Sequence, residues 1–87
     1  MDKVKRLIKA GASISGAVRE ALTQNGLTIS RFADKHGRNR QNMSAVIAGS
    51  RAPTDGDVAA LISELGGTEV EWKALLHEAG RPIAAVS

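Results

Sequence analysis

The sequence contains no cysteine, so neither a disulfide nor a thiolate metal site can stabilise the fold. Its aromatic residues are only Phe32 and Trp72, which means that the core must be built mainly from aliphatic side chains. The longest uninterrupted apolar run, residues 58–62, is far too short to cross a bilayer, and no apolar stretch of signal-peptide length follows the basic start. We therefore expect a cytoplasmic protein that does not enter a membrane.

The 87 residues leave room for one small domain. Hydrophobic residues make up 43% of the chain, which favours a continuous core over disorder. A core of this size rarely leaves more than about 3–5 kcal/mol of net stability, and association with a second copy is a common remedy.

The charges are unevenly distributed. Residues 1–51 carry ten Lys or Arg against three Asp or Glu, a balance of +7, whereas residues 52–87 carry two against six, a balance of −4. The first part should attract polyanions and the second should not. The alternative is that these charges only solvate the surface.

Glycines and capping residues divide the chain into segments whose apolar residues recur with helical spacing, and no strand-like alternation is visible. The fold class predicted is therefore all-α. The segment 2–10 is either a short basic helix or a mobile arm. Five firmer helices are predicted: from Ser13 or Ser15 to Asn25, from Thr28 to Gly37, from Asn39 to Gly49, from Thr54 or Asp55 to Gly66, and from Thr68 to Gly80.

The second and third of these helices form the pattern of a helix-turn-helix over residues 29–46, because both are short and a turn containing Gly37 separates them. Ala33 supplies the small side chain needed where two helices cross closely, and Gly37 tolerates a positive φ. The predicted core is Phe32, Ala33, Met43, Val46, Val58, Leu61, Ile62 and Leu65.

The stretches TISRFADKHG (28–37) and NRQNMSAVIAG (39–49), together with the order of five helices, resemble the lambda-repressor-like helix-turn-helix family. This family includes phage repressors, Cro-type proteins, plasmid regulators and some antitoxins. The resemblance covers residues 13–79 and implies a compact five-helix DNA-binding domain over 13–80, preceded by the basic segment 1–12 and followed by a tail, 81–87. Ile29 departs from the family, in which a Gln often stands at this position. His36 and Arg38 replace apolar residues, and we expect both to reach solvent.

If the third predicted helix docks as it does in that family, its exposed face reads the major groove. Arg suits guanine, Gln or Asn suits adenine, and Ala can pack on a thymine methyl group. The alternative is a merely solvated face. The candidate base-reading residues are Arg40, Gln41, Asn42, Ser44 and Ala45.

Other polar residues are better placed for the DNA backbone, because they flank this helix or begin helices, where N–H groups favour an anion. The candidate phosphate-binding residues are Thr28, Ser30, Arg38, Asn39 and Arg51, although Arg51 could equally be an idle charge. Lys5, Arg6 and Lys9 could form an arm on the backbone or in the minor groove, unless the first helix packs on the core.

A helix-turn-helix that reads a palindrome needs a partner, so we expect a homodimer that uses the acidic half while the basic half faces DNA. The candidate dimer contact comprises Trp72, Leu75, Leu76 and Ile83. For the first three, a place in the core is the simpler interpretation.

The sequence shows no constellation typical of catalysis, since His36 and His77 stand far apart and no paired carboxylates or activated nucleophile are visible. We expect no enzymatic activity, no cofactor and no metal. The function predicted is a dimeric repressor of phage, plasmid or mobile-element type on a palindromic double-stranded DNA operator, with a second regulatory protein as a possible partner. The alternatives are an antitoxin or other protein-interaction module, and a non-specific nucleoid-type DNA binder.

Overall fold

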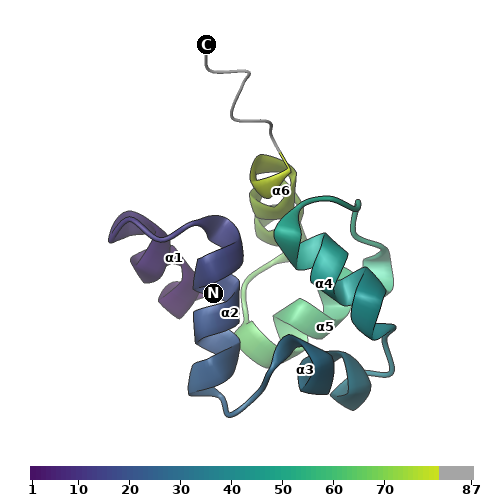
Figure 1. The fold of residues 1–87 in the computed structure, drawn as a ribbon. Helices are drawn as coiled ribbons and strands as arrows, with labels where there is room; N and C mark the ends of the chain where they lie inside the picture. Colours follow the sequence, from purple (N-terminus) through teal and green to yellow (C-terminus); the bar gives the residue numbers. More distant parts are fainter. Residues whose placement is uncertain (81–87) are drawn as a thin grey trace.

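A computed structural model describes residues 1–80, and the predicted tail, including Ile83, lies outside the described residues. From residue 1 to residue 80 the regular structure is entirely helical, which confirms the predicted class. Six helices are present where five were firmly predicted, because the open segment at the start is also a helix. They are α1 (Asp2–Lys9), α2 (Ile14–Gln24), α3 (Ile29–Lys35), α4 (Arg40–Ala48), α5 (Asp55–Leu65) and α6 (Glu69–Ala79) (Figure 1).

Five of the helices begin where a Ser, Thr or Asn side chain accepts a hydrogen bond from the backbone N–H three residues further on. Helices α5 and α6 carry complete capping boxes, in which Asp57 and Glu71 bond back to the capping residue. These caps lie at the helix starts predicted from sequence. Where two starts were possible, the capping residues are Ser13 and Thr54. The capping residues are Ser13, Thr28, Asn39, Thr54 and Thr68.

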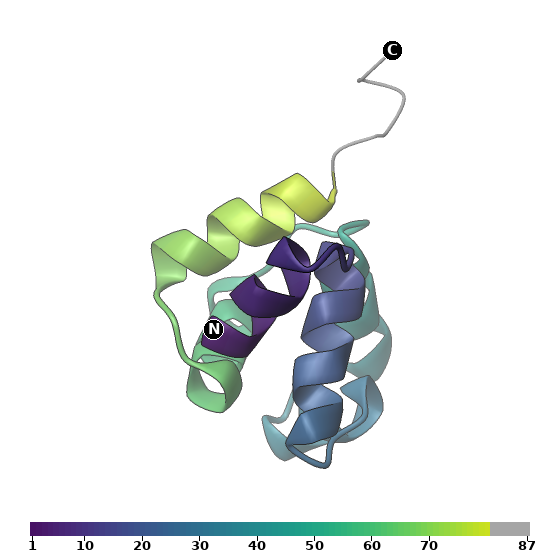
Figure 2. The same ribbon diagram turned by 90° about the vertical axis from the view of Figure 1, so that its left-hand side faces the viewer.

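Helix α2 lies at the centre of the fold and contacts α1, α3, α4, α5 and α6. In Figure 1, α1 lies on one side of α2 and α4 on the other, and the turned view in Figure 2 agrees. Helices α3 and α6 lie at opposite ends of the molecule in both views. None of the helices in residues 1–80 is long and apolar enough to cross a membrane.

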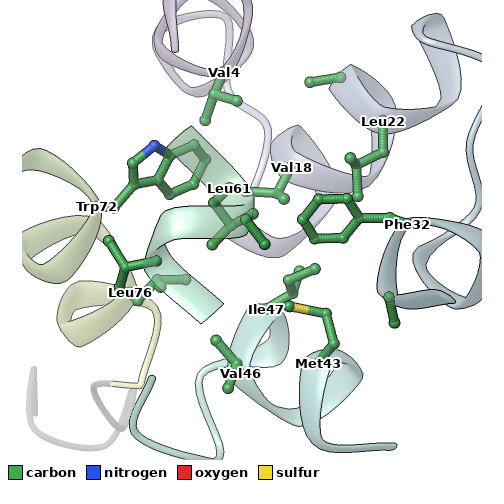
Figure 3. Packing of buried hydrophobic residues seen from close by; sticks show 14 of the residues in the cluster. Val4, Val18, Leu22, Phe32, Met43, Val46, Ile47, Leu61, Trp72 and Leu76 are labelled. Atoms are coloured by element: carbon green, nitrogen blue, oxygen red, sulfur yellow. The ribbon is translucent and has the colours of Figure 1, made fainter. Parts of the chain in front are cut away.

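Every helix contributes at least one fully or almost fully buried apolar side chain to a single core (Figure 3). Six of the eight predicted core residues are buried as expected. Ile62 and Leu65 are only half-buried and pack against the edge of the core. The labelled core side chains are Val4, Val18, Leu22, Phe32, Met43, Val46, Ile47, Leu61, Trp72 and Leu76.

Helix α1 is a packed element and not a mobile arm, because Val4 is completely buried in the core. Lys5 forms an ion pair with Glu71 of α6, which ties α1 to the other end of the chain. Of the two alternatives for the start of the chain, the structure has the short helix, over Asp2–Lys9.

Two of the four residues expected at a dimer contact are core residues instead. Trp72 has no exposed surface and Leu76 only 3%, because both point inward from α6. The indole N–H of Trp72 donates a hydrogen bond of 2.7 Å to the Gly66 carbonyl oxygen, which satisfies its one polar group. Neither side chain can contact a second copy in this fold.

Candidate nucleic-acid interface

Helices α3 and α4 pack directly on each other, and the chain reverses between them at Gly37, whose φ is +66°. The turn is closed by a 2.8 Å hydrogen bond from the Arg38 N–H to the Ala33 carbonyl oxygen. Ala33 of α3 is completely buried. The positive φ at Gly37 and the burial of Ala33 therefore agree with the sequence prediction.

Helix α4 has two distinct faces. Met43, Val46 and Ile47 are completely buried and provide its packing on the core. The remaining side chains face outward, with Arg40 and Gln41 exposed and Asn42, Ser44 and Ala45 half-buried. Among residues 1–80, no hydrogen bond involves the side chains of Gln41 or Ser44. This outward face is thus open to a ligand.

Arg40, a predicted base reader, is held by a neighbouring acid. Its Nε donates to Oδ1 of Asp34 at 2.9 Å and its Nη2 to Oδ2 at 2.6 Å. This forked arrangement lowers the pKa of Asp34 and raises the pKa of Arg40, mainly through the hydrogen bonds themselves. The two side chains remain 63% and 50% exposed, so the pair lies at the surface.

Arg38, a predicted phosphate contact, keeps 34% of its side-chain surface exposed, but its guanidinium is bound within the protein. Its Nε donates to Asp57 Oδ1 at 3.0 Å and its Nη2 to the Thr54 hydroxyl at 3.0 Å. The guanidinium lies over the first turn of α5, where a Cβ on Gly56 would approach its Nη1 to 2.6 Å. Arg38 therefore fastens the turn to the start of α5 through its Nε and Nη2.

His36 is also bound within the protein, and only 17% of its side chain reaches solvent. Its ring stacks at a tilt on Phe32, with centroids 5.0 Å apart, and its Nε2 lies 3.2 Å from Glu64 Oε1. The same carboxylate accepts hydrogen bonds from Lys35 at 2.9 Å and from the Asn25 side chain at 3.3 Å. Glu64 of α5 thus joins the end of α2 to the end of α3.

These pairs also change the interpretation of the charge distribution. Lys5, Lys35 and Arg38 of the basic half pair with Glu71, Glu64 and Asp57 of the acidic half. Ion pairs therefore join the two halves of the sequence.

The remaining predicted phosphate contacts differ in availability. The side-chain oxygens of Thr28 and Asn39 cap α3 and α4, and so they occupy the N–H groups of Arg31 and Asn42. Ser30 is exposed. Arg51 is exposed in the loop after α4, at the edge of a cleft of about 500 Å³ that Lys73 and His77 also line.

Sequence analysis did not single out two exposed arginines beside α4. Arg19 of α2 lines a shallow groove of about 360 Å³ with Thr28, Ser30 and Ser44, so it lies close to the outward face of α4. Arg31 of α3 is exposed, and within residues 1–80 neither arginine forms an ion pair. Helical spacing could have placed both on exposed positions, but only the tertiary fold brings Arg19 beside α4.

The other basic candidates lie elsewhere. Arg6 and Lys9 are exposed on α1, on the opposite side of α2 from α4 (Figures 1 and 2). The structure therefore does not bring α1 and the α4 face together.

Asp57 makes stability depend on pH. Burial acts to raise the pKa of its carboxyl, but hydrogen bonds from the Thr54 N–H and hydroxyl and from Arg38 outweigh burial and lower it. A lowered pKa means that this stabilisation is fully present above the ordinary value of 3.8 and is lost as the pH falls through the lower folded value.

We expect Asp57→Asn to reduce the free energy of unfolding at pH 7 by about 1–3 kcal/mol, because it weakens both the capping box and the Arg38 contact. Urea titrations at pH 7 and at pH 3 measure the change. The difference between variant and wild type should shrink at the lower pH, and a constant difference would contradict the role assigned to the carboxylate.

Comparison with family models, with curated proteins and with solved structures gives no match for this chain. In the part of the chain that the structure describes, no three His, Cys, Asp or Glu side chains are grouped so that they could hold a metal ion.

Proposed function

We propose that the protein is a sequence-specific double-stranded DNA-binding regulator whose α4 enters the major groove. The observation that carries this proposal is the division of α4 into a fully buried apolar face and an open face that bears Gln41, Ser44 and Ala45. A helix of this kind fits the major groove, and its side chains match the donors, acceptors and methyl groups of base edges. The lambda-repressor-like arrangement of α2 to α6 belongs to the same proposal.

Three exposed arginines on different sides of α4 supply the contacts to phosphate. They are Arg19 beside the start of α3, Arg31 on α3 and Arg51 after the end of α4. Contacts of this kind fix the register of a protein on a duplex without reading the sequence. They take the place of Arg38, whose guanidinium is held by Asp57.

The proposal includes two copies on a palindromic operator, where they would block transcription. Because Trp72 and Leu76 are buried, the surface left for a second copy on α6 comprises Leu75, which is half-buried, and Val70, which is 78% exposed. We propose a binding function without catalysis or a cofactor.

Gln41→Ala and Arg51→Ala distinguish base reading from positioning. Gln41→Ala should weaken binding to the cognate operator by roughly 1–3 kcal/mol and leave binding to random duplexes nearly unchanged. Arg51→Ala should weaken binding to both kinds of DNA and reduce the slope of log K against log salt by about one. Selection from random duplexes supplies the operator, and titrations at several salt concentrations give the affinities.

Two outcomes would contradict the proposal. If Gln41→Ala lowered the affinity for operator and scrambled DNA equally, α4 would not be the reader. If selection enriched no sequence, the protein would be a non-specific DNA binder or, without any DNA binding, a protein-interaction module such as an antitoxin. Co-purification of a second small chain would favour the latter.

A further inference from the structure

In the ion pair between Asp34 and Arg40, each charge interacts unfavourably with the dipole of its own helix. Asp34 is in the last turn of α3 and Arg40 is the first residue of α4. An acid near a helix C-terminus and a base near an N-terminus are each unfavourable. Neither charge is therefore explained by the stability of its own helix.

The pair also adds little to the fold. Both side chains are at least half exposed, so solvent and salt screen their attraction. The contrast with Arg38 is clear, because the Asp57 side chain is only 4% exposed and also caps α5. The Arg40–Asp34 pair is thus one that a ligand can displace.

The two Arg40 nitrogens that bind Asp34 are the same donors that would bind DNA. Arg40 offers a two-pronged donor set to the carboxylate through Nε and Nη2. The same fork fits O6 and N7 of guanine, and it also fits a phosphate. Asp34 therefore competes for Arg40 with any DNA that approaches the start of α4.

We propose that Asp34 is a specificity-determining residue, which holds Arg40 away from DNA unless the duplex offers a guanine placed to replace its carboxylate. On non-cognate DNA the pair stays closed, and Arg40 adds neither a phosphate contact nor net charge. This inference rests on the proposed DNA-binding function. It assigns to Asp34 the suppression of non-specific binding.

The test measures the affinity for a scrambled duplex of about 20 bp, the length of two half-sites one turn apart. Asp34→Asn should raise this affinity by about three- to tenfold at low salt, because it frees Arg40 for phosphate. The slope of log K against log salt should steepen by about one. The ratio of operator to scrambled affinity should fall.

Glu20→Gln is the matched control. It removes the same negative charge from an exposed position on α2, and the only side-chain hydrogen bond of Glu20 within residues 1–80 is to Gln24, so no guanidinium is released. We expect it to change the affinity for the scrambled duplex less than twofold and to leave the salt slope unchanged. Thermal unfolding of each variant shows whether the fold is retained.

A double-mutant cycle completes the experiment. In an Arg40→Ala background, Asp34→Asn should have no greater effect than Glu20→Gln. The proposal is overturned if Asp34→Asn resembles Glu20→Gln in the wild-type background, or if its gain persists without Arg40. If the wild type discriminates sequences through Gln41 while Asp34→Asn has no effect, only this inference fails. If neither protein binds duplex DNA, the proposed function fails with it.

Discussion

Gly49→Ala should remove most of the folding free energy of this protein. Gly49 ends α4 with a φ of +84°, and an added Cβ would lie 2.5 Å from the Ala79 carbonyl carbon and 2.6 Å from the Gly80 nitrogen. Both are backbone atoms at the end of α6, so rotation of a side chain cannot relieve the clash. We expect a loss of about 3 kcal/mol or more, measured as the shift in urea unfolding, because strain at positive φ and overpacking add to each other.

Gly37→Ala is the matched control for the close approach. Gly37 also has a positive φ, of +66°, but an added Cβ would meet no atom within 4 Å. Its substitution should therefore cost only the backbone term, about 1–2 kcal/mol. Equal losses for the two variants would show that α4 and α6 do not meet as closely as described.

Trp72→Ala should destabilise the protein to a similar extent. The indole is completely buried between α6 and the rest of the core, and it is one of the two aromatic residues in the chain. Its removal leaves a large cavity, and the Gly66 carbonyl oxygen loses its hydrogen-bond donor. We expect a loss of about 3–5 kcal/mol, which a core of this size can barely sustain.

Trp72→Phe separates the two contributions. It keeps an apolar ring but loses the N–H donor to Gly66, so the loss should be about 1–2 kcal/mol. Urea unfolding at several protein concentrations measures both variants. Since Trp72 is internal, neither loss should depend on protein concentration, and a strong dependence would instead support the contact with a second copy expected from sequence.

The helices were predictable from the sequence because their signals are local. Ser13, Thr28, Asn39, Thr54 and Thr68 each cap a helix within their own segment, and the apolar spacing gave the core face of α4. The start of the chain stayed open, because Val4, Leu7 and Ile8 form only a short apolar stripe in a basic segment, which does not show whether the helix packs.

The partners of charged side chains were not predictable in the same way. His36 and Arg38 were expected to reach solvent, but they bind Glu64 and Asp57, respectively. These partners lie 28 and 19 residues further along the chain. Such pairs depend on how α5 approaches the turn, which no local spacing reveals. Trp72 likewise could not be assigned to core or interface, because an apolar stripe on a helix fits both.

The packing of each helix on its neighbour in sequence has a consequence for how the chain reaches this fold. Helix α1 packs on α2, α3 on α4 and α5 on α6. Contacts of this kind close only short loops, and helical proteins dominated by them fold in microseconds to milliseconds. Newly made molecules of this protein should therefore spend little time with exposed apolar surface, which limits their opportunity to aggregate.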